Sequence, residues 1–428
     1  MVQLGRVATT YFKTRWDAKH IKSRAQLEGI QKRRLKRLLN WLPADNYYAP
    51  YKKTAWQEIP IADKASWLGH FNEINTLGLD FDQTREFARE QERTRDFDDE
   101  LRPGISVGLS SGTSGNQGVF LTSQREQSLW LGAILAKLLP KLPKKQKKVA
   151  FFMRANNNLY ESSNSSLLAF RFFDLFADVE ENLAKLEDFQ ADILIAPPAM
   201  LLEIVAFYQK KGLVLPFSKI ISIAETLEPE DKAYLEEVTG QTIHQVYQAT
   251  EGFLGATCEY GTLHLNEDNL LFEQEVVDEE DGLFVPIITD FYRHSQPVIR
   301  YRLNDVLQKR ATPCPCGSPM LALERIIGRE DDVLTFEKAN QAGIRKLFPD
   351  FVRKIVLEAD NRIQNYQVVQ EKDGTLTISL ENEGLYPAVE ANFKQFFNRE
   401  GLVAPAMHYQ TYRYDFKDGK RRKIIHRK

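Results

Sequence analysis

The spacing of hydrophobic residues changes several times along the chain, and each change marks a different kind of element. Between residues 19 and 42, apolar side chains recur at helical spacing among Lys, Arg and Gln, which predicts an amphipathic surface helix. A loop that contains Pro43, Pro50 and Pro60 follows. A mixed helical segment and a polar, charged run over residues 83–102 come next.

Between residues 150 and 252, short apolar runs alternate with stretches of helical periodicity, a pattern typical of βα units. Such an alternation predicts an α/β fold in which helices cover a largely parallel sheet. The expected strands span residues 192–196, 220–224 and 242–247, and the expected helices span residues 200–211 and 229–238.

The pattern changes twice more toward the C-terminus. After Gly261, strand and turn residues predominate around a tight acidic turn over residues 278–282, which predicts a β-rich subdomain. We therefore expect a large N-terminal domain, residues 1–331, and a small α+β domain, residues 332–428. The small domain should contain a helix over 344–359, a hairpin over 366–380, a helix over 388–398 and a strand over 409–414.

Length, charge and cysteine content limit the function classes. A chain of 428 residues exceeds one ordinary compact core, so two or three domains are expected. The 57 basic and 59 acidic residues give a formal charge of −2, which argues against nucleic acid or a membrane as a partner. No stretch of 18 apolar residues and no signal-peptide pattern occurs, and three cysteines fit a reducing compartment. A cytoplasmic protein is expected.

Residues 108–118 combine glycines with hydroxyl side chains. Glycines let backbone N–H groups approach phosphate oxygens, and hydroxyls add neutral donors, so this composition suits a polyphosphate. No Gly-Lys-Ser/Thr sequence closes the loop, so it is not a Walker A loop. A flexible linker is the other interpretation of the loop taken alone. The candidate binding residues are Ser110, Ser111, Gly112, Thr113, Ser114 and Gly115.

A second polar segment, residues 247–252, follows a predicted strand and reads Tyr-Gln-Ala-Thr-Glu-Gly. It places an aromatic ring, a hydroxyl and a carboxylate on one short turn. With the loop, this segment resembles the adenylate-forming superfamily of acyl-CoA synthetases, peptide-synthetase adenylation domains and luciferases. Within it, the chain is most similar to the phenylacetate–CoA ligase family and its coenzyme-F synthetase relatives. The resemblance covers nearly the whole chain, in five motifs in the expected order.

The resemblance implies roles for the residues of both segments. The loop 110–115 would bind the phosphates of ATP. Tyr247 would pack on adenine, Thr250 would meet the α-phosphate, and Glu251 would hold Mg²⁺, a hard cation that takes oxygen ligands. Gln248 stands where the family has glycine, which should narrow the space beside the nucleotide.

Further segments match the family's remaining motifs. Residues 299–305, Ile-Arg-Tyr-Arg-Leu-Asn-Asp, present Asp305 as the candidate acceptor for both ribose hydroxyls, because a carboxylate has two acceptor oxygens. In residues 328–332, Arg329 would contact the ribose or a phosphate, and Asp331 would be the hinge of a mobile C-terminal domain. Residues 222–226 correspond more weakly to the family's segment along the adenine, which implies Ala224, Glu225 and Thr226 as binding residues.

Lys420 matches the fifth motif, in Asp-Gly-Lys near the C-terminus. A carboxylate that attacks the negatively charged α-phosphate needs positive charge in the transition state. A lysine on a mobile domain would deliver that charge when the site closes. The basic run around it, residues 417–428, is also consistent with a solvated tail.

All three cysteines and one histidine fall into two short segments. Cys258 and His264 are separated by five residues, and Cys314 and Cys316 flank one proline. These ligands predict a structural Cys₃His zinc site, and similar positions occur in part of the resembled family. Three reduced thiols beside an unrelated histidine are the other interpretation.

Together with the resemblance, these residues predict an ATP- and Mg²⁺-dependent adenylate-forming ligase. It would activate a carboxylic acid as acyl-AMP and pass the acyl group to CoA or an acyl carrier protein. Phenylalanines in residues 151–161 and 170–176 suit an aromatic acid, although they also fit a core strand and a buried helix. Residues 333–343 lack the Arg-Gly-x-Asn-like turn of CoA-using members, so the thiol acceptor stays open.

Two other functions stay open from the sequence. One is a nucleotidyltransferase that adenylylates a hydroxyl of a cofactor, as coenzyme-F synthetases do, without forming a thioester. The other is a binding protein of the same fold without turnover. The sequence also leaves formation of a homodimer open.

Overall fold

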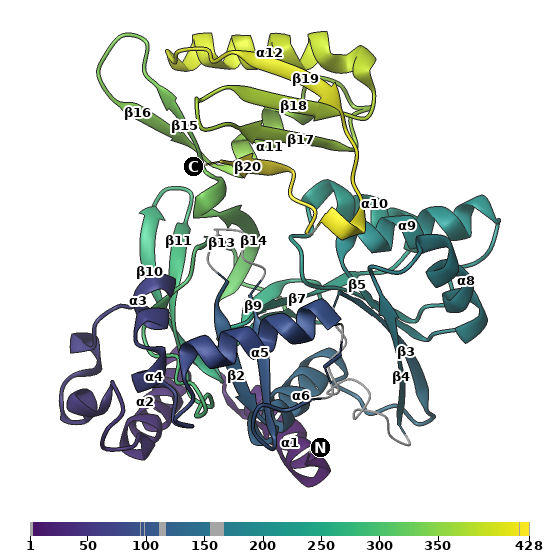
Figure 1. Ribbon diagram of the computed structural model, residues 1–428. Helices are drawn as coiled ribbons and strands as arrows, with labels where there is room; N and C mark the ends of the chain where they lie inside the picture. The colour runs from purple at the N-terminus through teal and green to yellow at the C-terminus, as the bar shows by residue number, and fades with distance from the viewer. Residues whose placement is uncertain are drawn as a thin grey trace. The chain divides into compact units, whose positions relative to one another are not determined.

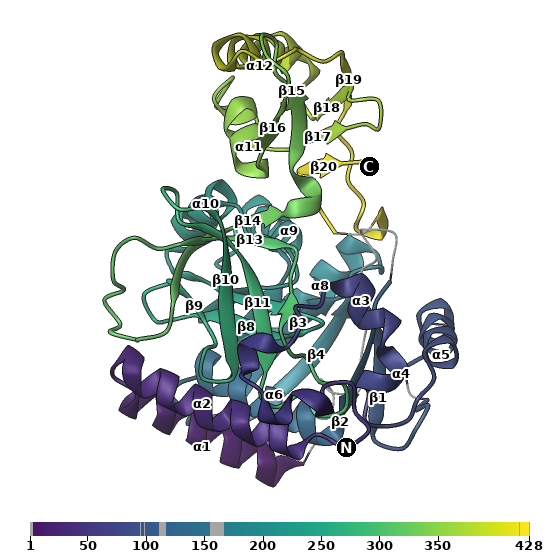
Figure 2. The same cartoon turned by 90° about the vertical axis from the view of Figure 1, so that its left-hand side faces the viewer.

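The computed structural model describes residues 3–94, 96–97, 99–110, 117–154, 167–418 and 420–427 (Figures 1 and 2). The chain divides into two compact units, which are described separately. The first comprises Met1–Leu303 and Lys309–Arg325, and the second comprises Asn304–Gln308 and Ile326–Lys428. The boundary expected after residue 331 falls within the second unit and stays a prediction.

The N-terminal region contains two helices, α1 (Leu4–His20) and α2 (Arg24–Trp41). The single helix expected over residues 19–42 was therefore wrong at its start. The break has a local cause, because Ser23 is extended and its hydroxyl accepts a hydrogen bond from Gln26 N at 3.3 Å, which caps α2. Helix α1 was not predicted.

A parallel sheet forms the centre of the first unit, with strands in the order β4-β3-β5-β6-β7. The chain passes from β4 to β7 through three helices, and the two over residues 200–211 and 229–238 were predicted. The expected strands and helices between residues 192 and 247 are confirmed, with ends shifted by a few residues. The elements are β3 (Lys147–Met153), β4 (Leu168–Asp174), α8 (Val179–Phe189), β5 (Ile193–Ala196), α9 (Pro198–Lys210), β6 (Lys219–Ser222), α10 (Pro229–Thr239) and β7 (Ile243–Ala249).

Helix α6 (Gln124–Leu138) packs on one face of this sheet, and α8, α9 and α10 lie on the other side (Figure 1). The α6 side of the core contains Ala133 and Leu138 together with side chains from β3 to β8. Full burial of an aliphatic side chain the size of valine or leucine stabilises the folded state by roughly 1.5–3 kcal/mol. Both faces of this sheet are covered, so β3 and β5 consist mainly of apolar residues, whereas β7 also contains polar residues such as Gln245 and Gln248.

Antiparallel strands extend the sheet beyond β7, so the β-rich segment after Gly261 is confirmed. Strands β8 (Gly252–Thr257) and β9 (Leu263–Leu265) follow in order, and β9 pairs with the start of β14 (Ala322–Arg329). The expected acidic turn joins a hairpin of two further strands. The remaining strands of this region are β10 (Leu270–Asp278), β11 (Leu283–Asp290), β12 (Tyr301–Arg302) and β13 (Asp305–Lys309).

A separate two-stranded hairpin, β1 (Ile105–Leu109) and β2 (Val119–Ser123), carries the glycine-rich loop. Short helices precede it, and the polar run over residues 83–102 begins in a helix rather than in a loop. These elements are η1 (Ala49–Lys53), η2 (Trp56–Glu58), α3 (Lys64–Gly69), α4 (Phe71–Ile74) and α5 (Phe81–Thr94). None of the helices among the described residues combines the length and the apolar character that a membrane crossing requires.

The second unit is a small α+β structure around a four-stranded sheet in the order β19-β18-β17-β20. The hairpin over 366–380 and the following helix are confirmed. The helix expected over 344–359 was wrong in part, because its first residues form a strand. The elements are η3 (Glu330–Asp332), β15 (Leu334–Glu337), β16 (Ile344–Leu347), α11 (Pro349–Leu357), β17 (Tyr366–Gln370), β18 (Leu376–Leu380), η4 (Glu383–Leu385), α12 (Tyr386–Glu400), β19 (Met407–Thr411), η5 (Phe416–Asp418) and β20 (Ile424–His426).

The basic C-terminal run is not simply a solvated tail. Strand β20 pairs in parallel with β17, so that Ile424 lies opposite Val368. Lys423 is buried, and its ammonium lies 5.3 Å from the centroid of the Tyr366 ring. The end of the chain therefore belongs to the core of the second unit.

The contact between α1 and α6 depends on a glycine. A Cβ atom at Gly132 would lie 2.6 Å from Val7 O and 2.7 Å from Thr10 Cβ. At Gly5, by contrast, a Cβ would meet nothing within 4 Å. Nearby, the Tyr11 hydroxyl donates a hydrogen bond to Leu139 O at 2.8 Å, which fixes the helices at this close approach.

We expect Gly132→Ala to lower the free energy of unfolding by about 1–3 kcal/mol, because the new methyl group overpacks the helix contact. The matched Gly5→Ala variant should be neutral or more stable by up to about 1 kcal/mol, since alanine favours a helix. Denaturant midpoints of both variants measure the difference. Equal stability of the two alanine variants would contradict the close contact.

Candidate functional site

The predicted binding residues of the first unit gather at one edge of the parallel sheet. Strands β3, β5, β6 and β7 are parallel, so their carboxyl ends share that edge. Arg154 follows β3, Glu225 lies just beyond β6, and Thr250 and Glu251 follow β7. After β3 the chain forms β4 on one side of it and then β5 on the other side, so the strand order reverses at β3. Open α/β sheets bind ligands at such switch points, outside the carboxyl ends of the strands.

Strands β1 and β2 flank the glycine-rich loop in the sequence. Leu109 lies opposite Val119, and Ser110 N donates to Gly118 O at 2.9 Å. Gly118 N donates in return to Ser110 Oγ at 2.7 Å. The base of the loop is thus closed by two hydrogen bonds. The predicted residues Ser111, Gly112, Thr113, Ser114 and Gly115 lie outside the described residues.

Lys64 brings a cationic side chain to the base of the loop, and the sequence analysis missed it. Its ammonium donates to Ser110 Oγ at 3.1 Å from the first residue of α3. A Cβ at Gly118 would lie 3.2 Å from Lys64 Cε and 2.8 Å from Phe120 Cε2, so only glycine fits there without a shift. No motif spacing signals this lysine, because the hairpin meets α3 only in the folded chain.

Thr250 and Glu251 form the turn between β7 and β8. The Thr250 hydroxyl donates to Glu251 Oε2 at 3.0 Å, and Glu251 is buried. Tyr247 is buried in β7. Gln248 is exposed and accepts a hydrogen bond from Trp130 Nε1 at 3.2 Å. The turn therefore presents a hydroxyl and a carboxylate together, as the motif predicted, while the roles of Tyr247 and Gln248 stay predictions.

The segment after β6 has a strained backbone. Ala224 adopts φ +67°, in the left-handed region that costs a residue with a Cβ roughly 1 kcal/mol or more. The Glu225 carboxylate is buried beside Arg154, with Oε1 at 3.5 Å from the guanidinium, while Thr226 is exposed. Strain of this kind is common at ligand sites. Arg154 is a second cation that the sequence analysis missed.

A buried segment between β11 and β12, residues 291–297, lies between the hairpin and the turn. The Arg293 guanidinium donates to Thr250 O at 3.0 Å and to Leu121 O in β2 at 3.2 Å. Arg293 therefore connects strand β2, which follows the loop, to the turn that carries Glu251. No motif in the sequence predicts this role.

Two buried carboxyl groups accompany Arg293, and their environments differ. Burial raises the pKa of Glu126, but the charge of Arg293 and hydrogen bonds from Ser123 and Ser295 outweigh burial, so the pKa of Glu126 is lowered overall. Complete burial raises the pKa of Asp290 to about 6, although Tyr292 N donates to Asp290 Oδ1 at 2.8 Å. The folded protein thus favours the ionised carboxylate of Glu126, whereas it favours the protonated, neutral form of Asp290.

The second unit brings the predicted ribose and hinge residues together. Arg329 Nε lies 3.8 Å from Asp305 Oδ1. Asn304 Nδ2 donates to Asp331 Oδ2 at 2.9 Å, and Glu330 N donates to Asn304 O at 2.8 Å. The two motifs therefore form one polar cluster, and the roles of its members in binding stay predictions.

Lys420 lies in the second unit, between η5 and β20. The basic residues that follow it have defined partners. Arg421 donates to Asn365 Oδ1 at 2.7 Å, Arg422 forms an ion pair with Asp332, and Lys423 stacks over Tyr366. Together these contacts hold the segment that presents Lys420.

The three cysteines and His264 meet in the first unit, as the spacing predicted. All four ligand atoms lie within 4.8 Å of one another. Cys258 Sγ is 3.6 Å from Cys314 Sγ, and Cys316 Sγ is 3.4 Å from His264 Nε2. Tetrahedral Zn²⁺, with bonds of about 2.3 Å to sulfur and 2.0 Å to nitrogen, needs ligand separations of about 3.5–3.8 Å. The Cys258–Cys314 and Cys316–His264 separations are close to this geometry.

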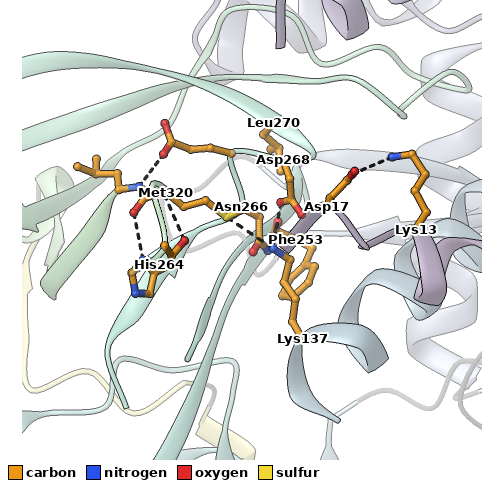
Figure 3. Close-up of polar contacts among 12 residues, drawn as sticks. Lys13, Asp17, Lys137, Phe253, His264, Asn266, Asp268, Leu270 and Met320 are labelled. Carbon is orange, nitrogen blue, oxygen red and sulfur yellow. Dashed lines mark hydrogen bonds and ion pairs between the residues drawn. The ribbon is translucent and has the colours of Figure 1, made fainter. Parts of the chain in front are cut away.

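Polar contacts hold the segment that carries His264 (Figure 3). His264 Nδ1 lies 3.1 Å from Met320 O, which leaves Nε2 directed at the sulfurs. Beyond His264, buried acidic groups anchor the same segment to two helices. Arg24 of α2 lies 2.6 Å from Glu267. Lys137 of α6 lies 2.9 Å from Asp268 (Figure 3). A cluster held in this way suits a structural ion.

The phenylalanines near the sheet edge fall into two groups. Phe152 and Phe173 are fully buried and stack at 4.5 Å, so they belong to the core. Residues 168–174 form strand β4 rather than a buried helix. Phe170 and Phe172 are only partly buried, while residues 155–161 lie outside the described residues.

Two curated proteins are similar to the chain over nearly half of its length. The phenylacetate-coenzyme A ligase of Aromatoleum evansii is 24% identical over 231 residues, which cover 49% of this chain and 50% of that protein. The phenylacetate-coenzyme A ligase of Thermus thermophilus is 23% identical over 212 residues, which cover 46% of each. The match spans about half the length of these curated relatives. No protein-family model matches the chain.

Solved structures show the same fold over nearly the whole chain. A 2-hydroxyisobutyryl-CoA ligase, in the postadenylation state with 2-HIB-AMP, aligns with a TM-score of 0.66 at 15% identity and covers 95% of this chain and 90% of that one. In complex with 2-HIB-AMP and CoA, in the thioesterification state, it aligns with a TM-score of 0.56. The resemblance drawn from the motifs is confirmed, and so is the α/β fold class.

Asp290 should make stability depend on pH. Its folded pKa of about 6 exceeds the ordinary value of 3.8, so the folded state holds the proton more tightly and loses stability as pH rises through this window. A shift of about two units corresponds to about 3 kcal/mol. We therefore expect the unfolding free energy of Asp290→Asn, relative to the parent, to rise by about 2.5 kcal/mol between pH 4 and pH 7.5.

Chemical denaturation at both pH values measures this change, with exposed Asp45→Asn as the control. The control should show no such trend. A difference between Asp290→Asn and the parent that stays constant with pH would contradict the assignment.

Proposed function

We propose that this chain, which is similar to phenylacetate–coenzyme A ligases and has the fold of an adenylate-forming acyl-CoA ligase, is itself an ATP-dependent acid–thiol ligase. It activates a carboxylic acid, aromatic in our proposal, as acyl-AMP and passes the acyl group to CoA or a carrier thiol. The observation that carries the proposal is the Arg293 bridge between the glycine-rich hairpin and the Thr250–Glu251 turn. It joins β2, the strand that follows the proposed phosphate loop, to the turn that carries a hydroxyl and a carboxylate.

In this proposal the first unit supplies the groups that bind the phosphates and the adenine, and the second unit supplies Asp305 and Arg329 for the ribose. The hairpin loop 110–115 binds the phosphates, with Lys64 at its base adding positive charge. Ala224, Glu225 and Thr226 lie along the adenine, and Tyr247 packs on it beside Gln248. Asp305 receives the ribose hydroxyls, and Arg329 lies beside it to contact the ribose or a phosphate.

Glu251 and Thr250 act where the α-phosphate reacts. A buried carboxylate with an adjacent hydroxyl suits Mg²⁺, which is held by one or two carboxylates together with substrate phosphates. Bound Mg²⁺ would neutralise phosphate charge. Thr250 would donate from its hydroxyl to an α-phosphate oxygen, and this donor is held in place by the turn.

The first step is an attack of a carboxylate oxygen on the α-phosphorus. A bond forms between that oxygen and phosphorus, the bond from the α-phosphorus to the bridging oxygen breaks, and pyrophosphate leaves. Negative charge increases on the phosphoryl oxygens, so a cation at this point stabilises the transition state. Lys420 supplies it when the C-terminal domain, residues 332–428, turns about Asp331 against residues 1–331.

In the second step a thiol attacks the acyl carbon. A carbon–sulfur bond forms, the bond between the acyl carbon and the AMP oxygen breaks, and the thiol proton passes to solvent. A 2-hydroxyisobutyryl-CoA ligase of the same fold is known in complex with 2-HIB-AMP and CoA, which supports a thioester product over the alternative. The relatives reported above give no support to adenylylation of a cofactor hydroxyl.

We also propose that Cys258, His264, Cys314 and Cys316 hold a structural Zn²⁺. The support is the separation of the ligand atoms and the hydrogen bond that orients His264. Four protein ligands leave no open position, so the ion would stabilise the fold around β9 and β14 and take no part in the reaction.

Exchange of labelled pyrophosphate into ATP tests the first step. We expect exchange that depends on an acid, in a screen of phenylacetate, benzoate and aliphatic acids. Glu251→Ala should abolish it, and Lys420→Ala should reduce it by about 10²-fold, because each removes charge stabilisation at the phosphates. Addition of CoA should convert the adenylate to a thioester that mass spectrometry detects.

Matched variants at exposed positions control this experiment. Glu280→Ala and Lys417→Ala each remove one charge of the same sign away from the site and should retain exchange. Full exchange by Lys420→Ala would exclude the role given to that lysine. Release of pyrophosphate without thioester formation in the presence of CoA or a carrier thiol would exclude the second step.

Metal analysis of the purified protein tests the zinc site. We expect about one equivalent of Zn²⁺, since structural sites bind tightly at neutral pH. His264→Gln should lose the ion and lower the melting temperature. His408→Gln, at an exposed position, should keep the ion and the melting temperature of the parent. Less than about 0.2 equivalents in undialysed protein would contradict the proposal.

A further inference from the structure

Residues 291–297, between β11 and β12, have no regular secondary structure, yet they lie largely inside the first unit. Arg293 is 7% exposed and Gln296 is fully buried. Buried irregular backbone is uncommon, because its polar groups need partners that no helix or sheet supplies. The partners that this segment has are therefore informative about its purpose.

Arg293 connects two parts of the proposed site. Its guanidinium donates to Leu121 O, in the hairpin strand that follows the phosphate loop, and to Thr250 O, beside Glu251. A guanidinium is planar, with donors in a fixed fork, so the two carbonyl groups that it binds are held at a defined separation. A lysine ammonium, being a compact point charge, does not impose this geometry.

Gln296 fixes the same hairpin strand from the other end of the segment. Leu121 N donates to Gln296 Oε1 at 2.9 Å, and Gln296 Nε2 donates to Val119 O at 3.1 Å. The side-chain amide thus makes hydrogen bonds to backbone groups of β2 that the backbone of a neighbouring strand would otherwise make. Trp67 Nε1 also donates to Pro297 O at 3.3 Å, which ties the segment to α3. The position of β2 therefore depends on residues 293–297.

Glu126 anchors the segment and balances its charge. This carboxylate caps α6 by accepting from Ser123 N at 2.6 Å. It also accepts from His294 N at 2.5 Å and from Ser295 N at 2.7 Å. A buried cation without a counter-ion would be strongly destabilising, so the carboxylate also makes the burial of Arg293 tolerable. The segment is fixed to α6 before it reaches the hairpin and the turn.

We infer that Arg293 is a positioning residue that sets the separation between the phosphate-loop hairpin and the Thr250–Glu251 turn. The inference rests on the proposed function, in which the hairpin holds the phosphates and Glu251 holds the Mg²⁺ bound to them. One ion bridging both parts requires both at a fixed separation. An error of about 1 Å in such an arrangement costs about 10²-fold in rate.

Comparison of Arg293→Met with Arg34→Met tests the inference. Arg34 is a comparably buried arginine of the same unit, and its guanidinium donates to Asp17 Oδ2 at 2.7 Å. Both variants should lose stability. Only Arg293→Met should raise the Mg²⁺ concentration for half-maximal pyrophosphate exchange at least fivefold and lower the maximal rate by about 10²-fold. Arg293→Lys should recover stability but not the Mg²⁺ dependence.

Amide hydrogen exchange provides a readout that does not need activity. Arg293→Met or Arg293→Lys should speed exchange at residues 119–122 and 249–253 together, and Arg34→Met should not. If the Arg293 variants match Arg34→Met in both readouts while the parent is active, the inference fails and the proposed function stands. If the parent shows no acid-dependent pyrophosphate exchange, the proposed function fails, while unchanged amide exchange in the Arg293 variants refutes the coupling on its own.

Discussion

The buried pairing of Glu126 with the segment that carries Arg293 is the constraint on which the proposed site depends. Glu126 accepts hydrogen bonds from the start of α6 and from residues 294–295, and Arg293 then binds carbonyl groups of β2 and of the Thr250 turn. Each ion would be costly alone in the interior. Together they connect a helix, a hairpin and a turn that are distant in the sequence, and they do so through backbone atoms.

This arrangement explains how separate motifs become one site. The parallel strands bring Arg154, Glu225 and Glu251 to one edge, because carboxyl ends of parallel strands coincide. The β1–β2 hairpin is a separate sheet. Among the described residues, Arg293 connects its strand β2 to the Thr250 turn, and Gln296 and Lys64 also bind the hairpin. The cysteine cluster lies beside the antiparallel extension of the large sheet, where Glu267 and Asp268 form ion pairs with helices α2 and α6. In the proposed function, the groups for phosphate and Mg²⁺ and the zinc ligands therefore belong to different parts of the first unit.

Periodicity predicted the elements whose packing is regular. The βα pattern between residues 192 and 247 and the hairpin over 366–380 have the expected form, because their apolar spacing is set by burial. The pattern was misleading where local polar contacts decide. Ser23 divides the first helical region, and Ile344 begins a strand that pairs with β15. Strand β20 consists of residues from a basic run whose burial no periodicity announces.

The candidate site shows the same division. Clusters read from spacing, such as Cys314 with Cys316 or Thr250 with Glu251, come from one short segment and were predictable. Lys64, Arg154 and Arg293 reach the site from distant segments and make contacts with backbone or with single side chains. No spacing in the sequence encodes such contacts. Their chemistry emerges only when the fold brings separate elements together.

The central claim is that a carboxylate oxygen attacks the α-phosphorus of ATP. An acid that supports pyrophosphate exchange, labelled with ¹⁸O in its carboxylate, tests this claim directly. When the thiol step is complete, cleavage of the bond between the acyl carbon and oxygen leaves one ¹⁸O atom on the phosphate of AMP. The proposed mechanism predicts that each turnover yields one AMP molecule with a single ¹⁸O atom, which mass spectrometry detects. Unlabelled AMP, or ¹⁸O found in inorganic phosphate beside ADP, would contradict it.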